Sequence, residues 1–208
     1  IEYATCPDLV ISENAIETIE ILLYQKYSKL VKQDPSVIET IASLLLAAID
    51  AQREDATAPL AELAECLSTY NKEKLHAFAP QLLQVCEKVL NSNTIRCAAA
   101  IAEAFPEEVS ANALEYSDTA MRMILESTDD DTSYQLMISV STFVKCMSPD
   151  DLNQFMQLLM KYITDCPQIS MLDGTRLIAK QIGPQFAEFL PIFMEYLLGV
   201  STQYINML

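Results

Sequence analysis

Residues that commonly carry out catalysis are scarce in this sequence. It has a single histidine, His76, which restricts the kinds of metal and catalytic site that are possible. One histidine cannot supply the two histidine ligands of a His-Glu-x-x-His or Cys₂His₂ zinc site, and a Ser-His-Asp triad would have to use His76. His76 precedes Pro80 in a polar stretch, where we expect a partly exposed turn residue. The three glycines are isolated, so neither common phosphate-binding loop is present. The sequence predicts no enzyme, no cofactor and no metal site.

The acidic run Asp129 to Asp131 could suggest a calcium loop. Such a loop needs glycine at its sixth position and glutamate at its twelfth, and this chain has Tyr134 and Val140 there. The three carboxylates are better explained as favourable negative charge at the start of a helix beginning near Thr132.

Six cysteines are scattered singly and form no Cys-x-x-Cys pair: Cys6, Cys66, Cys86, Cys97, Cys146 and Cys166. Most fall within helical patterns, which favours reduced, buried thiols over a disulfide framework. This pattern is typical of a protein of the cytoplasm or nucleus.

The composition favours an all-α fold. Among 208 residues, 51% are apolar, 20% are charged and only 3 are glycine. The net charge of −16 would repel nucleic acid and anionic membranes and attract basic partners, although a simply soluble acidic surface would look the same. The longest nearly unbroken apolar run, residues 41–49, is too short for a membrane span. Because the first residue is Ile1, we expect either a segment cut from a longer chain or a processed chain.

A repeated pattern indicates the architecture. The stretch from Phe186 to Leu198 repeats the apolar and proline positions of Leu75 to Glu87 at a distance of 111 residues, which is three steps of 37. Three columns at this step are apolar in 13 of 15 positions. The columns are Leu45, Leu82, Thr119, Met156 and Phe193; Leu46, Leu83, Ala120, Gln157 and Met194; and Ile49, Cys86, Met123, Met160 and Leu197. They lie at i, i+1 and i+4 of one helix, so we predict five copies of that helix.

A period near 37 residues accommodates two helices and a turn. We therefore predict a single right-handed α-solenoid of HEAT/armadillo-like helical pairs over residues 1–208. The predicted repeats are 12–52, 55–90, 93–127, 131–164 and 167–200. The predicted helices are 12–32 and 35–52, 58–69 and 79–90, 94–105 and 111–126, 132–146 and 150–164, and 167–182 and 185–200. Pro80 is placed in the first turn of its helix, where proline is tolerated, and Asn93 is expected to cap the helix after it.

Several segments in the last quarter of the chain form a recognisable pattern: Met156-Gln157-Leu158-Leu159, Thr164-Asp165-Cys166-Pro167-Gln168-Ile169-Ser170, Phe186, Phe189-Leu190-Pro191 and Met194. Together they resemble the importin-beta superfamily of nuclear transport receptors, and most closely its importin-beta-3 branch. The similarity covers about 40 residues and has two departures, Phe189 in place of tyrosine and Cys166 in place of an acid.

This resemblance implies a carrier that moves between cytoplasm and nucleus through nuclear pores. It implies three partners: cargo with basic signals on the concave face, phenylalanine-glycine nucleoporins on the outer face, and the GTPase Ran in its GTP form. Import and export remain open. The alternative is a static HEAT scaffold subunit of a multiprotein complex, which would ignore Ran.

In such a fold the second helices line the inner curve, with the side chains opposite the core stripe pointing into it. Carboxylates there could bind lysine and arginine of a cargo, or could be ordinary solvated helix residues. The candidate cargo-binding residues are Gln81, Gln84, Asp118, Asp151, Glu188 and Glu195.

Overall fold

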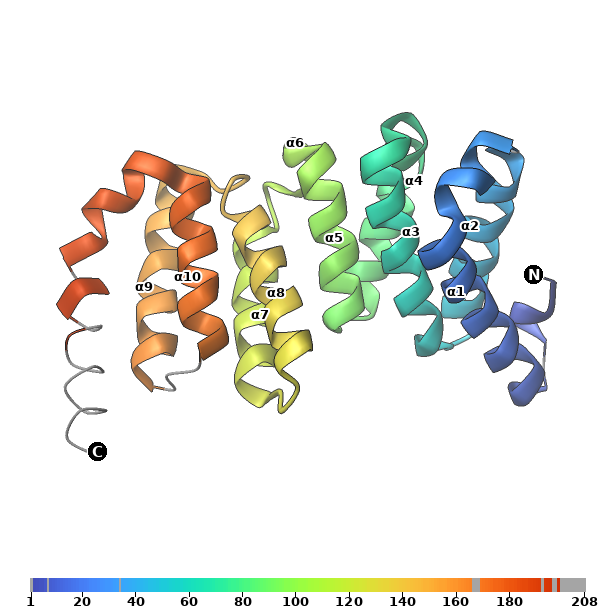
Figure 1. Cartoon of the computed structure of the whole chain (residues 1–208), viewed down its shortest axis with the longest axis horizontal. Helices are drawn as coiled ribbons and strands as arrows, with labels where there is room; N and C mark the ends of the chain where they lie inside the picture. Colours follow the sequence, from blue (N-terminus) through green and yellow to red (C-terminus); the bar gives the residue numbers. More distant parts are fainter. Residues whose placement is uncertain are drawn as a thin grey trace. The chain divides into compact units, whose positions relative to one another are not determined.

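The structure is a computed structural model of the chain and describes residues 2–6, 8–33, 35–165, 169–191, 193–195 and 198. Throughout this part the regular secondary structure is helical, without strands (Figure 1). The predicted all-α fold of packed helical repeats is therefore confirmed, while its handedness and its 37-residue period stay predictions. The helices form two compact units, Ile1–Val109 and Ser110–Leu208, which are described separately.

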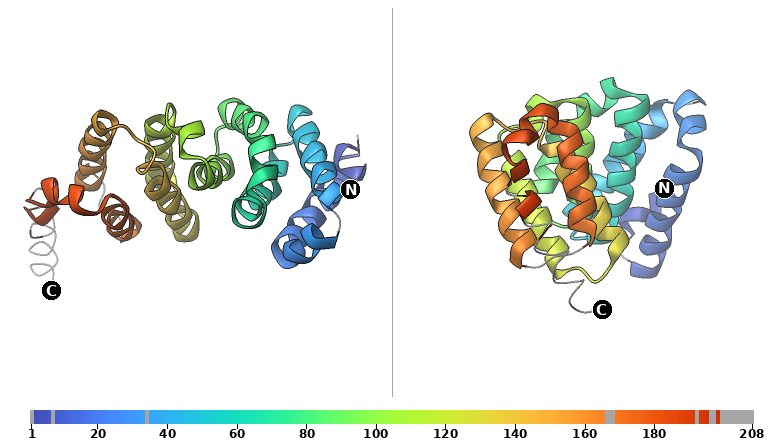
Figure 2. Two further views of the ribbon diagram at one scale, coloured as in Figure 1. Left: turned by 90° about the horizontal axis from the view of Figure 1, so that it is seen from above. Right: turned by 60° about the vertical axis from the view of Figure 1, so that its left-hand side comes forward.

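The first unit arranges its long helices in two layers. Helix α3 packs against both α1 and α5, whereas α2 packs against α4, so first helices contact first helices and second helices contact second helices (Figure 2). Short turns join the members of each pair, as in other helical-repeat folds. The elements are η1 (Glu2–Thr5), α1 (Leu9–Gln33), α2 (Pro35–Asp50), η2 (Glu54–Ala56), α3 (Thr57–Tyr70), α4 (Lys72–Lys88), α5 (Ser92–Ala104) and α6 (Pro106–Val109).

The second unit repeats this scheme. Helix α8 packs against α7 and α10, and α7 packs against α9. The elements are α7 (Ala113–Glu126), α8 (Asp130–Phe143), α9 (Pro149–Asp165), α10 (Ile169–Ile182) and η3 (Gly183–Glu188). The third predicted repeat, residues 93–127, contributes its first helix to one unit and its second helix to the other.

The observed burial of side chains agrees better with the predicted column that begins at Leu45 than with the column that begins at Leu46. Leu45, Leu82, Met156 and Phe193 are buried, and Thr119 is half-buried. The neighbouring column is half-buried at Leu46 and Leu83, buried at Ala120, and exposed at Gln157 and Met194. The core stripe of the second helices is therefore narrower than the sequence pattern suggested.

The start of α4 differs from the prediction. The helix begins at Lys72 rather than near Ala79, so Pro80 lies in its interior and offers no N–H to the carbonyl of the residue four positions earlier. The Asn71 side chain caps the helix by accepting a hydrogen bond from the Lys74 amide at 3.2 Å. Leu75 is fully buried, so its burial and this cap offset the lost hydrogen bond.

Two other helix ends also differ from the prediction. Asn91, not Asn93, caps α5, because its side-chain oxygen accepts the amides of Asn93 and Thr94, each at 3.0 Å. After α10 the chain enters the 3₁₀ helix η3 instead of the predicted helix from residue 185. Gly183 makes this turn with a φ of 58°, a conformation that favours glycine. Parts of the predicted helix 185–200, and residues 166–168, lie outside the described residues.

We expect Asn91→Ala to lower the free energy of unfolding by about 1 kcal/mol, because two amides of the first turn of α5 lose their acceptor. Urea denaturation followed by circular dichroism would measure the change. Ser92→Ala, at the first helical position, is the matched control and should have little effect. Equal losses in both variants would mean that the cap does not stabilise the helix.

The stability of the first turn of α8 should depend on pH. Hydrogen bonds from Thr132 to the carboxylate of Asp129, the cap of α8, hold the pKa of Asp129 below its ordinary value. A depressed folded-state pKa means stabilisation that is present above the unfolded pKa of about 4 and lost as pH falls through the folded value. The protection factor of the Thr132 amide, which compares its exchange rate with that of an unfolded chain at the same pH, should therefore fall only in strong acid. Asp129→Asn should remove this dependence, and Asp130→Asn should retain it.

Candidate protein-binding surfaces

A groove runs between α2 and α4 in the first unit. It encloses about 340 Å³. Its walls are one stripe from each helix, at i, i+3, i+4 and i+7 in both: Ser43, Leu46, Ala47 and Asp50 from α2, and Gln81, Gln84, Val85 and Lys88 from α4. The groove exists because Ser43 and Ala47 are too small to fill the space opposite the longer side chains of α4.

Two ion pairs cross this seam, one near each end. Lys88 Nζ lies 3.5 Å from Asp50 Oδ1, and Lys74 Nζ contacts Glu39 Oε1. Glu39 and Lys74 both precede Asp50 and Lys88 along their helices, so α2 and α4 run parallel. Exposed pairs like these add little stability, but they place charge at the mouth of the groove.

The predicted residues Gln81 and Gln84 both line this groove and are both exposed. Each amide offers donors and an acceptor, which suit a peptide backbone. Asp50 adds a carboxylate that a basic side chain of a partner would share with Lys88 or take from it. Within the first unit, the arrangement therefore fits binding of a polypeptide with basic residues.

Asp118 has partners within its own chain. Its carboxylate accepts a hydrogen bond from the Tyr162 hydroxyl at 2.7 Å and pairs with Arg122. Burial, followed by this hydrogen bond to Asp118, raises the pKa of Tyr162. The contact joins α7 to α9, so Asp118 has a structural role beside any role in binding.

Asp151 also serves the fold locally. The Ser148 hydroxyl donates to its carboxylate at 2.7 Å and accepts its amide at 3.2 Å, which caps the start of α9. Asp151 lies three turns before Tyr162, about 16 Å along the axis of α9. Asp118 and Asp151 therefore do not form one site.

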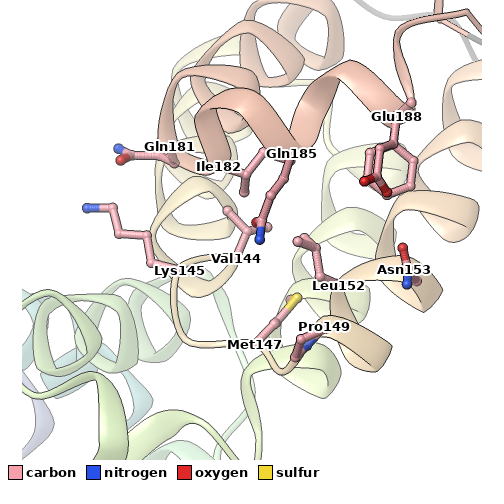
Figure 3. Close-up of a pocket in the computed structure, with 11 residues that line it drawn as sticks. Val144, Lys145, Met147, Pro149, Leu152, Asn153, Gln181, Ile182, Gln185 and Glu188 are labelled. Carbon is pink, nitrogen blue, oxygen red and sulfur yellow. The ribbon is translucent and has the colours of Figure 1, made fainter.

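The remaining predicted residues lie further along the second unit. Glu195 is exposed, and Glu188 is exposed at the end of η3. Glu188 lines a cleft of about 530 Å³ between the α8–α9 turn and the end of α10 (Figure 3). Sequence reasoning missed this cleft. The signals that could have found it are the two turns that frame it, Ser148-Pro149 and Gly183-Pro184.

The chemically reactive side chains form no catalytic arrangement that we can identify among the described residues. His76 lies within α4, not in a turn; its ring packs against Phe105 at 5.0 Å, and its Nε2 is 3.7 Å from Glu108. Burial, followed by the charges of two neighbouring glutamates, raises the pKa of the Cys66 thiol to about 11. Cys86 and Cys97 are free and fully buried. Because their pKa values are raised, the thiols of Cys66 and Cys97 stay protonated and are poor nucleophiles.

Within the part of the chain that the structure describes, two further kinds of feature are absent. There, groups of three or more histidine, cysteine, aspartate or glutamate side chains able to hold a metal ion are absent. Among those same residues, none of the helices combines the length and apolar character that crossing a membrane requires.

A scan against known protein families, a search of curated proteins and a search of solved structures find no match to this chain.

Proposed function

We propose that the chain is a protein-binding segment of helical repeats belonging to a nuclear transport receptor. In this proposal the receptor carries cargo with basic signals between cytoplasm and nucleus through nuclear pores. It would also bind phenylalanine-glycine nucleoporins and release or exchange its cargo under control of Ran-GTP.

The groove between α2 and α4 carries the protein-binding part of the proposal. Successive second helices present amides and a carboxylate on facing stripes, and the chain has a net charge of −16, which favours basic partners. The narrower assignment to a transport receptor depends on the resemblance of residues 156–170 and 186–194 to that superfamily.

The test is a pull-down of the full-length parent protein with Ran loaded with GTP or with GDP. Selective binding of the GTP form, with release of a bound basic cargo, would support the transport function. Equal or absent binding would contradict it and leave the static scaffold as the better hypothesis. The scaffold should then co-purify with a stable protein partner.

The groove itself can be tested by substitution. Asp50→Lys should weaken binding of a fluorescein-labelled Lys/Arg-rich peptide at least about tenfold, because attraction becomes repulsion. Ala47→Trp should do the same by filling the space between the helices. The matched control is Glu87→Lys, which changes the net charge equally at an exposed position of α4 outside the groove.

Fluorescence polarisation at fixed ionic strength would give the dissociation constants. If Glu87→Lys weakens binding as much as Asp50→Lys, the effect comes from total charge and the groove is not the binding site.

A further inference from the structure

The cleft in the second unit is chemically distinct from the groove between α2 and α4. Its middle is apolar, formed by Val144, Met147, Leu152 and Ile182. Val144 and Leu152 are buried, so the floor is fixed by the core, whereas the half-buried Met147 has a flexible side chain that can adapt to an occupant. A volume of about 530 Å³ is large enough for a large aliphatic side chain and the backbone that carries it.

Exposed amides surround this apolar middle. Asn153, Gln181 and Gln185 line the cleft and are exposed. Gln185 points into the cleft toward Val144 and Leu152, whereas the amide of Gln181 points outward (Figure 3). A primary amide offers both donors and an acceptor and so can pair with the N–H and C=O of a peptide unit. Amides arranged around an apolar floor therefore suit an extended polypeptide.

The two sides of the cleft carry opposite charges. Glu188 and Asn153 lie on one side of the view in Figure 3, and Lys145 lies on the other. A basic residue of a bound peptide is therefore favoured beside Glu188 and disfavoured beside Lys145.

We propose that this cleft binds an extended peptide in which a large aliphatic residue adjoins a lysine or arginine. The aliphatic side chain occupies the floor at Leu152, the rim amides bond the peptide backbone, and Glu188 receives the basic side chain. This recognition does not require Ran, because it uses only side chains that line the cleft, so it can fail or hold independently of the Ran-GTP test above.

The test uses three fluorescein-labelled hexapeptides and the whole chain. The parent peptide is Ser-Gly-Lys-Leu-Gly-Ser, and the other two replace its leucine with serine or its lysine with glutamate. Fluorescence polarisation should show binding of the parent peptide and at least about fivefold weaker binding of each replacement, since each loses one main contact. A dissociation constant above about 1 mM for the parent peptide, or equal binding of all three, would overturn the proposal.

Protein variants locate the binding to the cleft. Gln185→Ala and Glu188→Gln should each weaken the parent peptide at least about threefold, and Glu188→Gln should lose the preference for lysine over glutamate. All the changed residues are exposed, so thermal unfolding should be unaffected. Gln154→Ala, an exposed amide that neighbours Asn153 but does not line the cleft, is the matched control. Equal weakening by Gln154→Ala, or none by the two cleft variants, would refute the assignment.

Discussion

Replacing Arg96 with methionine is expected to lower the free energy of unfolding by about 2 to 3 kcal/mol at neutral pH. The guanidinium of Arg96, on α5, donates to Glu62 at 2.7 Å and to both carboxylate oxygens of Glu65 at 3.0 Å, and both acids belong to α3. Arg96 and Glu62 retain only 20% and 19% side-chain exposure, so removal of the cation leaves the carboxylate of Glu62 unpaired and poorly solvated. The 40% exposure of Glu65 keeps the expected loss below that of a fully buried pair.

The loss of unfolding free energy caused by Arg96→Met should depend on pH. Burial raises the pKa of Glu65 above its ordinary value even though Arg96 lowers it, so without Arg96 the pKa should rise further. A carboxyl whose folded pKa exceeds its unfolded pKa destabilises the folded state once pH rises above both, and this destabilisation disappears as pH falls toward the unfolded value. The gap between wild type and Arg96→Met should therefore narrow from about pH 7 to about pH 5.

Urea denaturation at several pH values would measure that gap. Glu62→Gln and Glu65→Gln, added to Arg96→Met, should recover part of the loss at neutral pH because the unpaired charges are gone. Arg176→Met is a control at the ion pair between Arg176 and Asp173, which is exposed on both sides, and should change stability little. A gap that stays constant with pH and is not reduced by the two glutamines would mean that Arg96 acts through packing alone.

The sequence was enough to predict which segments are helical, but not where every helix begins and ends. Apolar periodicity and capping residues predicted most of the helices because both signals are local. At α4 a local rule competed with tertiary packing: proline argues for a start near Ala79, but the Asn71 cap and the burial of Leu75 extend the helix back to Lys72. Local propensity alone could not weigh those contacts.

The candidate site residues also differ in whether local signals or contacts between helices determine their surroundings. The repeat columns predicted that Gln81 and Gln84 lie away from the core stripe, and both are exposed. That they line a groove with α2 depends on the neighbouring helix and could not be predicted from the periodicity of α4 alone. Asp118 could not be interpreted in this way, because its partner Tyr162 is 44 residues distant and comes from another helix. The capping role of Asp151 was accessible, since Ser-x-x-Asp before an apolar helix is a known capping pattern.

Gly174→Ala is expected to lower the free energy of unfolding by about 2 kcal/mol, although alanine normally favours a helix by about 1 kcal/mol. Gly174 is buried in α10 where this helix packs against α8. An added methyl group would lie 2.8 Å from both Cβ and Cγ of Met137 and would also clash with its Cε. The Cβ of Met137 is fixed to its backbone, so rotation of its side chain cannot relieve the contact and the two helices must separate.

A double-mutant cycle with Met137→Ala distinguishes this crowding from a general intolerance of α10. Met137 is fully buried, so its truncation alone should cost about 2 to 3 kcal/mol by leaving a cavity. In that background the methyl group added by Gly174→Ala partly fills the space left by Cγ and Cε, so this substitution should cost at least about 1 kcal/mol less than in wild type. Additive losses in urea denaturation would contradict the contact. Coupling of this size would show that the close approach of α8 and α10 requires glycine at position 174, because only the shared space between these two side chains can make their effects interdependent.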